Sequence, residues 1–296
     1  MLNDTLKTGV SINLKFIKMI KSLCTVLFAL ATITSFSQNN FQGKATYMSK
    51  TSMDMSRYDK MSEQQKKQMM ARFKSFLEKT YTLSFNKTTS SFRENVQLEG
   101  PGASGPSWSR SNGQGSIYKN IPDKNMIEDI EMFSKRFLVS EKMEPLQWEM
   151  GMETKKIGNY TCYKATLVKE DTKVDWGAIF SRRRNNKKKD STNTKDSKPA
   201  KKMLNVTAWY APQIPVSSGP DKYYGLPGLI LELNAGRTTM LCTEIAISST
   251  GDLEIKEPTK GKEVSREEYT QIIKEKTEEL KERFKNRGRG GRGKGY

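Results

Sequence analysis

Alternating apolar and polar positions dominate this chain, in short runs separated by Gly, Pro, Asn and Ser. Alternation with a period of two is typical of strands that bury one face. It predicts strands over Gly43–Ser52, Ser116–Lys119, Phe133–Glu141, Leu146–Glu153, Gly158–Lys169, Leu204–Tyr210, Leu229–Leu233, Thr238–Ser248 and Leu253–Glu257, and a hairpin within Thr80–Phe92.

Two segments follow helical spacing instead. Ser62 and Gln65 form a capping-box pattern, and the apolar residues behind it fall on one helical face: Met69, Met70, Phe73, Phe76 and Leu77. A second capping box, Ser265 with Glu268, precedes the stripe Tyr269, Ile272, Ile273, Leu280 and Phe284. This second stripe is either a face that packs on the fold or a surface for a membrane or a partner helix.

Many short strands with one helix after the first strand and another near the end predict a mainly β (α+β) fold. We expect a single antiparallel curved sheet or half-barrel over residues 38–257, followed by a C-terminal helix over 258–285.

The N-terminus has the pattern of a signal peptide. Lys18 and Lys21 precede the 11-residue apolar run Leu23–Ile33, and Ser35 and Ser37 suit cleavage before Gln38. The run is too short to span a bilayer, which needs about 20 apolar residues. Residues 1–37 therefore predict export to the periplasm or outer envelope of a Gram-negative bacterium, with Met19 as an alternative start to Met1; a core helix is the alternative reading.

The net charge of +18 is concentrated in a few segments. Ser181–Lys202 holds ten Lys/Arg and two Asp, and Arg283–Tyr296 holds six Lys/Arg and no acid, so the remaining mature chain is nearly neutral. We expect the insertion 181–202 and the Gly/Arg tail 286–296 to be disordered. They would make weak contact with anionic lipopolysaccharide or polysaccharide, and we expect neither a transmembrane segment nor specific nucleic-acid binding.

The absence of histidine excludes Ser-His-Asp and Cys-His catalysis and imidazole metal sites. Glu128, Asp129 and Glu131 form an acidic patch that we interpret as solvated. The sequence therefore predicts a protein that is not an enzyme and has no cofactor or metal; a hydrolase based on Ser or carboxylate chemistry is the least favoured alternative.

Cleavage before Gln38 would leave two cysteines, Cys162 and Cys242, both in strand-like runs. In an oxidising compartment they could form a disulfide between neighbouring strands, or remain two buried and inert thiols. Both possibilities stay open at this point.

An ordered series of motifs ends in Gly225–Ile230, which reads GLPGLI. The series begins at Trp148 and continues through Lys155–Tyr160, Cys162–Ala165, Ala208–Tyr210, Ile214-Pro215 and Gly219-Pro220. It resembles the GLPGLI family of secreted bacterial proteins over roughly Gly43 to Ile255. That family has no agreed activity, so the resemblance implies kinship and export but no chemistry.

The hexapeptide also has a physical interpretation of its own. Leu226-Pro227-Gly228-Leu229 predicts a type II turn that leads into a buried strand. Alternatively, Gly225 and Gly228 would let a ligand or partner chain approach the backbone closely.

From these features we expect a protein that binds an apolar ligand or an extended partner segment in the concave face of its sheet. The candidate binding residues are Trp209, Tyr210, Tyr223, Tyr224, Gly225, Leu226, Pro227 and Gly228. The alternative is a structural or adhesion protein whose basic segments contact anionic surfaces of the cell envelope.

Overall fold

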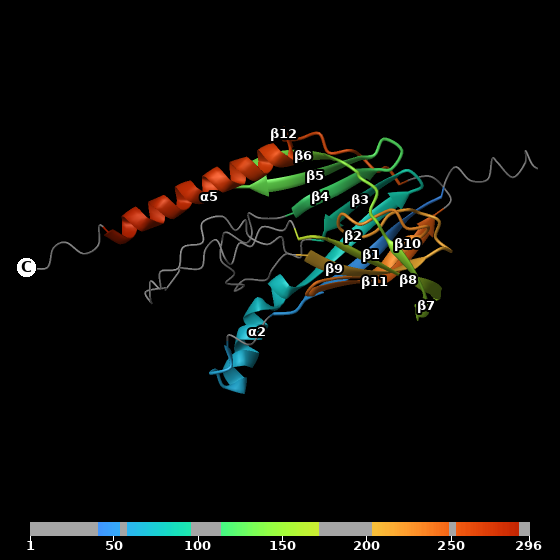
Figure 1. The fold of residues 1–296 in the computed structure, drawn as a ribbon, viewed down its shortest axis with the longest axis horizontal. Helices are drawn as coiled ribbons and strands as arrows, with labels where there is room; N and C mark the ends of the chain where they lie inside the picture. The colour runs from blue at the N-terminus through green and yellow to red at the C-terminus, as the bar shows by residue number, and fades with distance from the viewer. Residues whose placement is uncertain (1–40, 54–57, 96–113, 172–202, 249–252, 290–296) are drawn as a thin grey trace, which may run out of the picture. The chain divides into compact units, whose positions relative to one another are not determined.

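The computed structural model describes residues 41–53, 58–95, 114–171, 203–248 and 253–289. The chain divides into two units, and nearly all described residues lie in the unit formed by Gly43–Ala246 and the chain from Leu253 onward. Across the described residues the structure contains one large open sheet of 12 strands and two helices (Figure 1). The predicted mainly β class, with a helix after the first strand and another near the C-terminus, is confirmed.

The strand bounds are β1 (Gln42–Thr51), β2 (Glu78–Asn86), β3 (Thr89–Glu94), β4 (Gln114–Asn120), β5 (Asn125–Met132), β6 (Lys135–Lys142), β7 (Glu149–Ile157), β8 (Tyr160–Glu170), β9 (Met203–Ala211), β10 (Leu229–Ala235), β11 (Thr238–Ser248) and β12 (Lys262–Ser265). Their order in the sheet is β12-β6-β5-β4-β3-β2-β1-β11-β10-β9-β8-β7. The strands at the two edges of the sheet are therefore β12 and β7.

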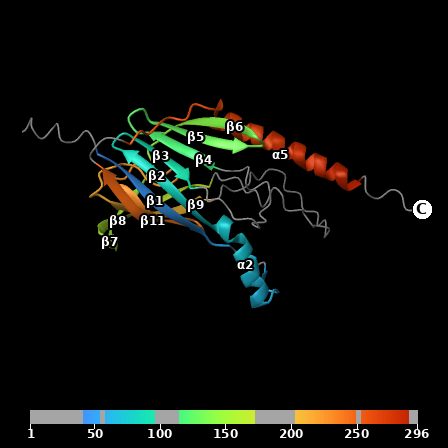
Figure 2. The same ribbon diagram turned by 180° about the vertical axis from the view of Figure 1, so that it is seen from behind.

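Most neighbouring strands are antiparallel, as expected. Consecutive strands pair antiparallel from β2 to β6 in one series and from β7 to β11 in the other, and β1 lies between the two series (Figure 2). Thr51 Oγ1 lies 2.9 Å from Thr238 Oγ1, and Gly43 lies beside Ala246, so β1 also runs against β11. The exception is β12, which pairs with β6 in parallel. The predicted curvature into a half-barrel stays a prediction.

Both helices begin at the predicted capping boxes. α2 (Glu63–Leu77) starts after Ser62, whose side chain accepts from the backbone N–H of Gln65 while the Gln65 side chain accepts from the N–H of Ser62. α5 (Arg266–Arg289) starts after Ser265, which exchanges the same two bonds with Glu268. α5 begins eight residues after the predicted start at residue 258, because Lys262–Ser265 form β12 instead, and it continues four residues beyond the predicted end at residue 285.

Two differences from the predicted strands have clear physical reasons. The prediction missed β5 because three acidic residues interrupt its alternation; Glu128 and Asp129 are nevertheless buried, so the interpretation of these acids as solvated was wrong. The predicted strand Leu253–Glu257 is wrong too, since this segment pairs with no strand. Its Ile255 packs instead against Tyr118, Ile127 and Leu138.

The face of β2–β6 that carries Leu83, Phe92, Ile117, Lys119 and Glu128 is covered, and we call it the packed face. α5 covers one end of this face, where Tyr269 and Ile273 pack against Phe137 and Val139 of β6. The packing stripe predicted for this helix is thus confirmed for its first turns.

Candidate functional site

The long loop between β9 and β10, Pro212–Gly228, covers the rest of the packed face. We call it the β9–β10 loop. Several of its side chains are almost fully buried: Ile214, Val216, Ser218, Tyr223 and Leu226. Buried apolar side chains of this kind each stabilise a fold by roughly 1.5–3 kcal/mol, so the loop belongs to the core although it has no regular secondary structure.

Ser218 links strands that stand four positions apart in the sheet. Its carbonyl oxygen accepts from the N–H of Ile230 in β10 at 3.1 Å, and its Oγ lies 2.8 Å from Oγ of Ser90 in β3. Tyr47 of β1 adds a 2.6 Å hydrogen bond to the carbonyl of the same Ile230. The loop therefore joins the two halves of the sheet across β1.

The side chain of Lys119, on β4, binds backbone carbonyl groups in the next part of the loop. Its side chain is fully buried, and Nζ donates to the carbonyl oxygens of Gly219, Asp221 and Tyr223 at 2.7, 2.8 and 3.2 Å. Burial lowers the pKa of Lys119 from 10.5 to about 7, against a smaller opposing effect of Asp221. The three acceptors fix the loop conformation around Asp221, whose backbone has a positive φ of 53°.

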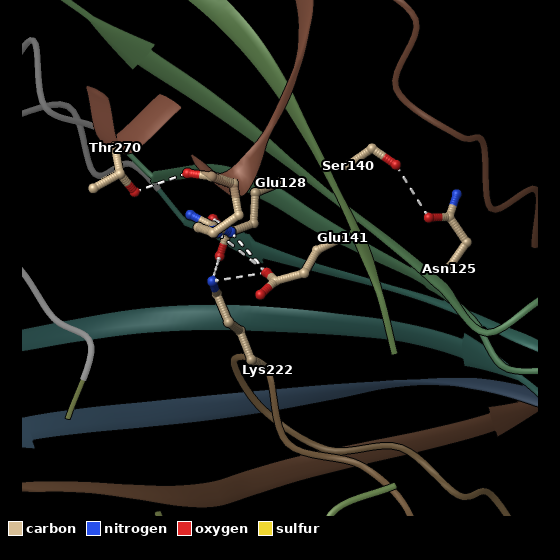
Figure 3. A network of polar contacts seen from close by, with 7 residues as sticks. Asn125, Glu128, Ser140, Glu141, Lys222 and Thr270 are labelled. Carbon is tan, nitrogen blue, oxygen red and sulfur yellow. Dashed lines mark hydrogen bonds and ion pairs between the residues drawn. The ribbon is translucent and has the colours of Figure 1, made fainter. Parts of the chain in front are cut away.

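A network of four charges, of which Glu128 is buried and the other three are partly exposed, ties the loop to the C-terminal helix (Figure 3). Lys222 Nζ lies 2.5 Å from Glu128 and 3.6 Å from Glu141, while Arg266 Nη2 lies 2.5 Å from Glu128 and 3.0 Å from Glu141. Glu128 and Glu141 come from β5 and β6, so the network joins the sheet, the loop and the first residue of α5. Its two negative and two positive charges balance.

The pKa of Glu141 reflects this balance. Burial alone would raise the pKa of its carboxyl, but Lys222 and Arg266 outweigh that effect and hold it below its usual value. The Glu141 carboxylate is thus held ionised by nearby cations, which is the arrangement of a structural network and not of a general acid.

The glycines of the hexapeptide have roles that differ from the predicted turn. The residue with positive φ is Gly225, at 94°, and not Gly228, so the type II turn at Leu226–Leu229 was wrong. A Cβ on Gly228 would lie 2.3 Å from the carbonyl oxygen of Ala211. Gly228 therefore permits close approach, as the alternative proposed, but the approaching backbone is the chain's own.

The aromatic residues predicted to bind a ligand are divided among different environments. Tyr223 is buried under the ring of Trp148 and the Nζ of Lys169, which lies 4.4 Å from the Tyr223 ring centre. Tyr224 donates to the carbonyl of Glu144 at 2.5 Å and accepts from Trp148 Nε1 at 2.8 Å through its own carbonyl. These contacts hold the β9–β10 loop against residues 143–148, the segment that leads from β6 to β7.

Trp209 and Tyr210 are consecutive residues of β9 and so point to opposite faces of the sheet. Lys155 of β7 lies 4.8 Å from the Trp209 ring centre and forms a 2.5 Å ion pair with Glu232. Tyr210 lies on the other face beside Tyr163 of β8, with ring centres 6.1 Å apart. Of the predicted binding residues, Tyr210 lies at a pocket; Tyr223, Leu226 and Gly228 are buried in the core.

Both predicted partner cysteines are buried free thiols in this structure. β9 and β10 lie between the strands that carry Cys162 and Cys242. Three strand spacings of about 4.8 Å exceed the Cα separation that a disulfide spans, about 7 Å at most. The structure accordingly forms no disulfide between them, and burial raises the pKa of Cys162 to about 11 and of Cys242 to about 12.

β7 is the most exposed strand of the sheet. None of its residues is buried, and Met150 and Met152 are 55% and 98% exposed. Its pairing with β8 is irregular between Met150 and Thr154, where the strand bulges, and regular from Thr154 to Ile157. A bulge protects the first part of the edge from pairing with another chain, so the regular part is where such pairing is possible.

The backbone groups of this regular part that pair with no described strand can be identified. Thr161, which lies opposite Lys156, donates its N–H to the Gln213 side chain at 3.1 Å on the side of β9. The pair Lys156–Thr161 is therefore not hydrogen-bonded within the hairpin, and Lys156 directs its N–H and C=O outward. Because the pattern alternates, Thr154 does the same. We call residues Thr154–Ile157 the β7 edge.

A pocket of about 300 Å³ lies one strand inward from the β7 edge. It is lined by Thr161, Tyr163, Tyr210, Pro212 and Gln213. Two tyrosine rings and a proline give it an apolar wall, and the Gln213 side chain adds a polar group. Among the residues that the structure describes, no group of three or more His, Cys, Asp or Glu is placed to hold a metal ion.

Sequence reasoning missed the residues that hold the loop, namely Lys119, Glu141, Lys222 and Arg266. Each belongs to an ordinary polar run, and their contacts join residues up to 138 positions apart, so no local signal marks them. The predicted signal peptide (1–37), the basic insertion (181–202) and most of the tail lie outside the described residues. Within the described part of the chain, no helix is long and apolar enough to cross a membrane.

Comparison with known families finds a match that includes this region. Residues 148–232 match a family model described as "Protein of unknown function (Porph_ging)". The matched segment runs from Trp148 through β7, β8, β9 and the β9–β10 loop into β10. The name GLPGLI is not part of that description, so the family resemblance is confirmed only as similarity to a family without a known function.

No curated protein matches the chain. Two crystal forms of PNGF-II are similar at 12% and 11% identity, with TM-scores of 0.44 and 0.45, over 78% and 79% of this chain and 33% and 32% of PNGF-II. LprF from Mycobacterium bovis has 7% identity and a TM-score of 0.23, over 77% of this chain and 92% of LprF. The chain thus spans about a third of the length of PNGF-II. At TM-scores below 0.5, none of these similarities indicates a shared function.

Proposed function

We propose that this protein is an exported, non-enzymatic protein of the cell envelope that binds an extended segment of a partner protein along the β7 edge. The observation that carries the proposal is the free, regular stretch Thr154–Ile157, with outward N–H and C=O groups on Thr154 and Lys156. An unpaired strand edge is a template for an incoming strand, which gains main-chain hydrogen bonds on pairing.

The position of the β9–β10 loop favours this edge over the concave face that the sequence suggested. The loop fills the packed face with its own buried side chains and with the carbonyl groups bound to Lys119. A ligand on that face would have to displace the four-charge network around Glu128 as well. The β7 edge requires no such rearrangement.

The other edge of the sheet is a weaker candidate. β12 has four residues and continues directly into α5, whose first turns pack on the same region of β6. β7 has nine residues and pairs with β8, whose Thr161 and Tyr163 line the pocket. Its longer edge offers an incoming segment more main-chain hydrogen bonds than β12 does.

Photo-crosslinking in the native host tests the proposal. A photoreactive amino acid at Met152, beside the β7 edge, is compared with the same residue at Met48 of β1, which is also exposed. We expect a discrete adduct with another protein from position 152 and none from position 48. Identical adducts from both positions, or no protein adduct at 152, would contradict the proposal.

A second pair of variants tests the pairing itself. Lys156→Pro removes the outward N–H donor, whereas Lys156→Ala removes the same side chain and keeps the donor. We expect the adduct from position 152 to disappear with Lys156→Pro and to persist with Lys156→Ala. Equal loss in both variants would show that the side chain, and not the backbone edge, is recognised.

The alternative function is adhesion of a structural envelope protein through the basic segments 181–202 and 286–296 to lipopolysaccharide or polysaccharide. Deletion of both segments should then release the chain from envelope fractions. If fractionation is unchanged after the deletion, adhesion by these segments is excluded.

A further inference from the structure

The pocket beside Tyr210 contains a polar group that the fold leaves without a partner. Tyr210 is only 8% exposed, yet its hydroxyl makes no hydrogen bond with any described residue. In the described structure every fully buried side-chain oxygen or nitrogen has a partner, so the Tyr210 hydroxyl is in contact with solvent. Because Tyr210 lines the pocket and is otherwise covered, this hydroxyl opens into the pocket.

Three further groups of the pocket are polar and unpaired. The hydroxyls of Thr161 and Tyr163 and the amide nitrogen of Gln213 make no hydrogen bond within the described part of the chain. None of the five lining residues carries a charge. A ligand that pairs with these groups therefore needs several uncharged donors and acceptors, and hydroxyl groups are both.

The wall of the pocket is already ordered. The side-chain oxygen of Gln213 accepts from the Thr161 N–H at 3.1 Å, which fixes the position of the amide nitrogen. Pro212 occupies the second position of a tight turn, which is closed by a 3.1 Å hydrogen bond from the Ile214 N–H to the Ala211 carbonyl. A site of this kind loses little conformational freedom when a ligand binds.

The two tyrosine rings offer an apolar surface to a flat ligand. Their centres are 6.1 Å apart, their planes are tilted by 35°, and Tyr163 is 39% exposed. A sugar ring has an apolar face, formed by its C–H groups, and hydroxyl groups around its edge. The pocket volume of about 300 Å³ is at the lower end for ligand sites, which suits one or two sugar rings.

We propose that this pocket binds an uncharged sugar residue of a glycan, with the sugar ring against Tyr163 and its hydroxyls bonded to Tyr210 and Gln213. A fatty acyl chain fits less well, because it would cover the Tyr210 hydroxyl without pairing it. An anionic group fits less well, because no lining residue is cationic. The site is independent of the β7 edge, since no residue of Thr154–Ile157 lines it.

Isothermal titration calorimetry of the full chain with maltotriose, cellotriose and triacetylchitotriose tests the proposal. We expect saturable binding of at least one of these saccharides. Tyr210→Phe removes only the unpaired hydroxyl, so it should weaken the binding about threefold to tenfold without lowering the melting temperature. The matched control is Tyr118→Phe, which should bind like the parent chain. Tyr118 is also buried, its hydroxyl likewise has no described partner, and it lies outside the pocket.

A second variant tests the aromatic surface. Tyr163→Leu keeps an apolar side chain but removes the ring, so it should weaken the binding by at least about tenfold. The proposal is overturned if none of the three saccharides binds, or if Tyr210→Phe and Tyr163→Leu both bind like the parent chain. An equal loss in Tyr118→Phe and Tyr210→Phe would also exclude it, because the binding would then not depend on the pocket. Circular dichroism establishes that each variant is folded.

Discussion

Gly228 shows at the scale of one residue why the hexapeptide needs glycine. The backbone of Ala211 and Pro212 occupies the space that a side chain would take. We predict that Gly228→Ala lowers the free energy of unfolding by at least about 2 kcal/mol, because the added methyl group must displace backbone. Chemical denaturation measures the change. Gly151→Ala is the control, since its added Cβ would lie 3.3 Å from the nearest atom; equal losses in both variants would contradict this role.

Lys119 gives the structure a pH dependence. The unfolded chain holds the lysine proton up to its ordinary pKa of 10.5, whereas the folded chain releases it near 7. Between these values the unfolded state binds more protons, so raising the pH favours folding through this group, by at most about 1.4 kcal/mol per pH unit. We predict that the free energy of unfolding of the parent chain, minus that of Lys119→Met, increases from pH 7 to pH 10.

A stability difference that does not change with pH would contradict the lowered pKa of Lys119. If the difference between the parent and Lys119→Met stays constant from pH 7 to pH 10, the three carbonyl groups hold the amine protonated in the folded chain and burial is the weaker effect. Denaturant unfolding of both chains at pH 7, 8.5 and 10 distinguishes the two outcomes.

The cysteines allow a test of burial against disulfide formation. We predict that at pH 8 the folded chain reacts slowly with a thiol reagent, because burial and a raised pKa keep Cys162 and Cys242 from forming thiolates. After denaturation both should react at the rate of a free thiol. A denatured, unreduced chain in which neither cysteine reacts would show that a disulfide does form.

At the scale of elements, the four-charge network fixes the β9–β10 loop and α5 to the same two strands. Removing one cation leaves the buried Glu128 with one cation instead of two, so we predict that Lys222→Met and Arg266→Met each lower the free energy of unfolding by about 1–3 kcal/mol. Lys222 and Arg266 each pair with both Glu128 and Glu141. The loss in free energy of unfolding in the double variant should therefore differ clearly from the sum of the losses in the two single variants. A double-mutant cycle measures this coupling, and strict additivity would show that the loop and helix are held independently.

The elements that could be predicted from the sequence are those whose signals are local. Both capping boxes and the alternation of β11, whose bounds Thr238–Ser248 are those expected, act within a few residues. β5 was missed because Glu128 and Asp129 resemble a solvated patch until Lys222, Arg266 and Arg136 neutralise them from elsewhere in the chain. Ion pairs between residues far apart in the chain produce no periodic pattern in the sequence.

At the scale of the whole described structure, the same limit applies to the candidate site. The aromatic and glycine residues around the hexapeptide were recognised as a cluster, but whether they bind a ligand or their own chain depends on where the β9–β10 loop lies. That position is set by contacts of Ser218 and Lys119 with residues about 100 or more positions away. The β7 edge could not be recognised either. The alternation of apolar and polar residues in one strand does not show where that strand lies in the sheet.

Residue-resolved amide hydrogen exchange tests directly whether the β9–β10 loop fills the packed face and leaves the β7 edge free. We predict slow exchange for the amides of Val216, Leu229 and Ile230, whose N–H groups donate to loop carbonyls, and fast exchange for Thr154 and Lys156. Slow exchange at Thr154 and Lys156 in the purified chain, together with fast exchange at Leu229 and Ile230, would contradict this prediction.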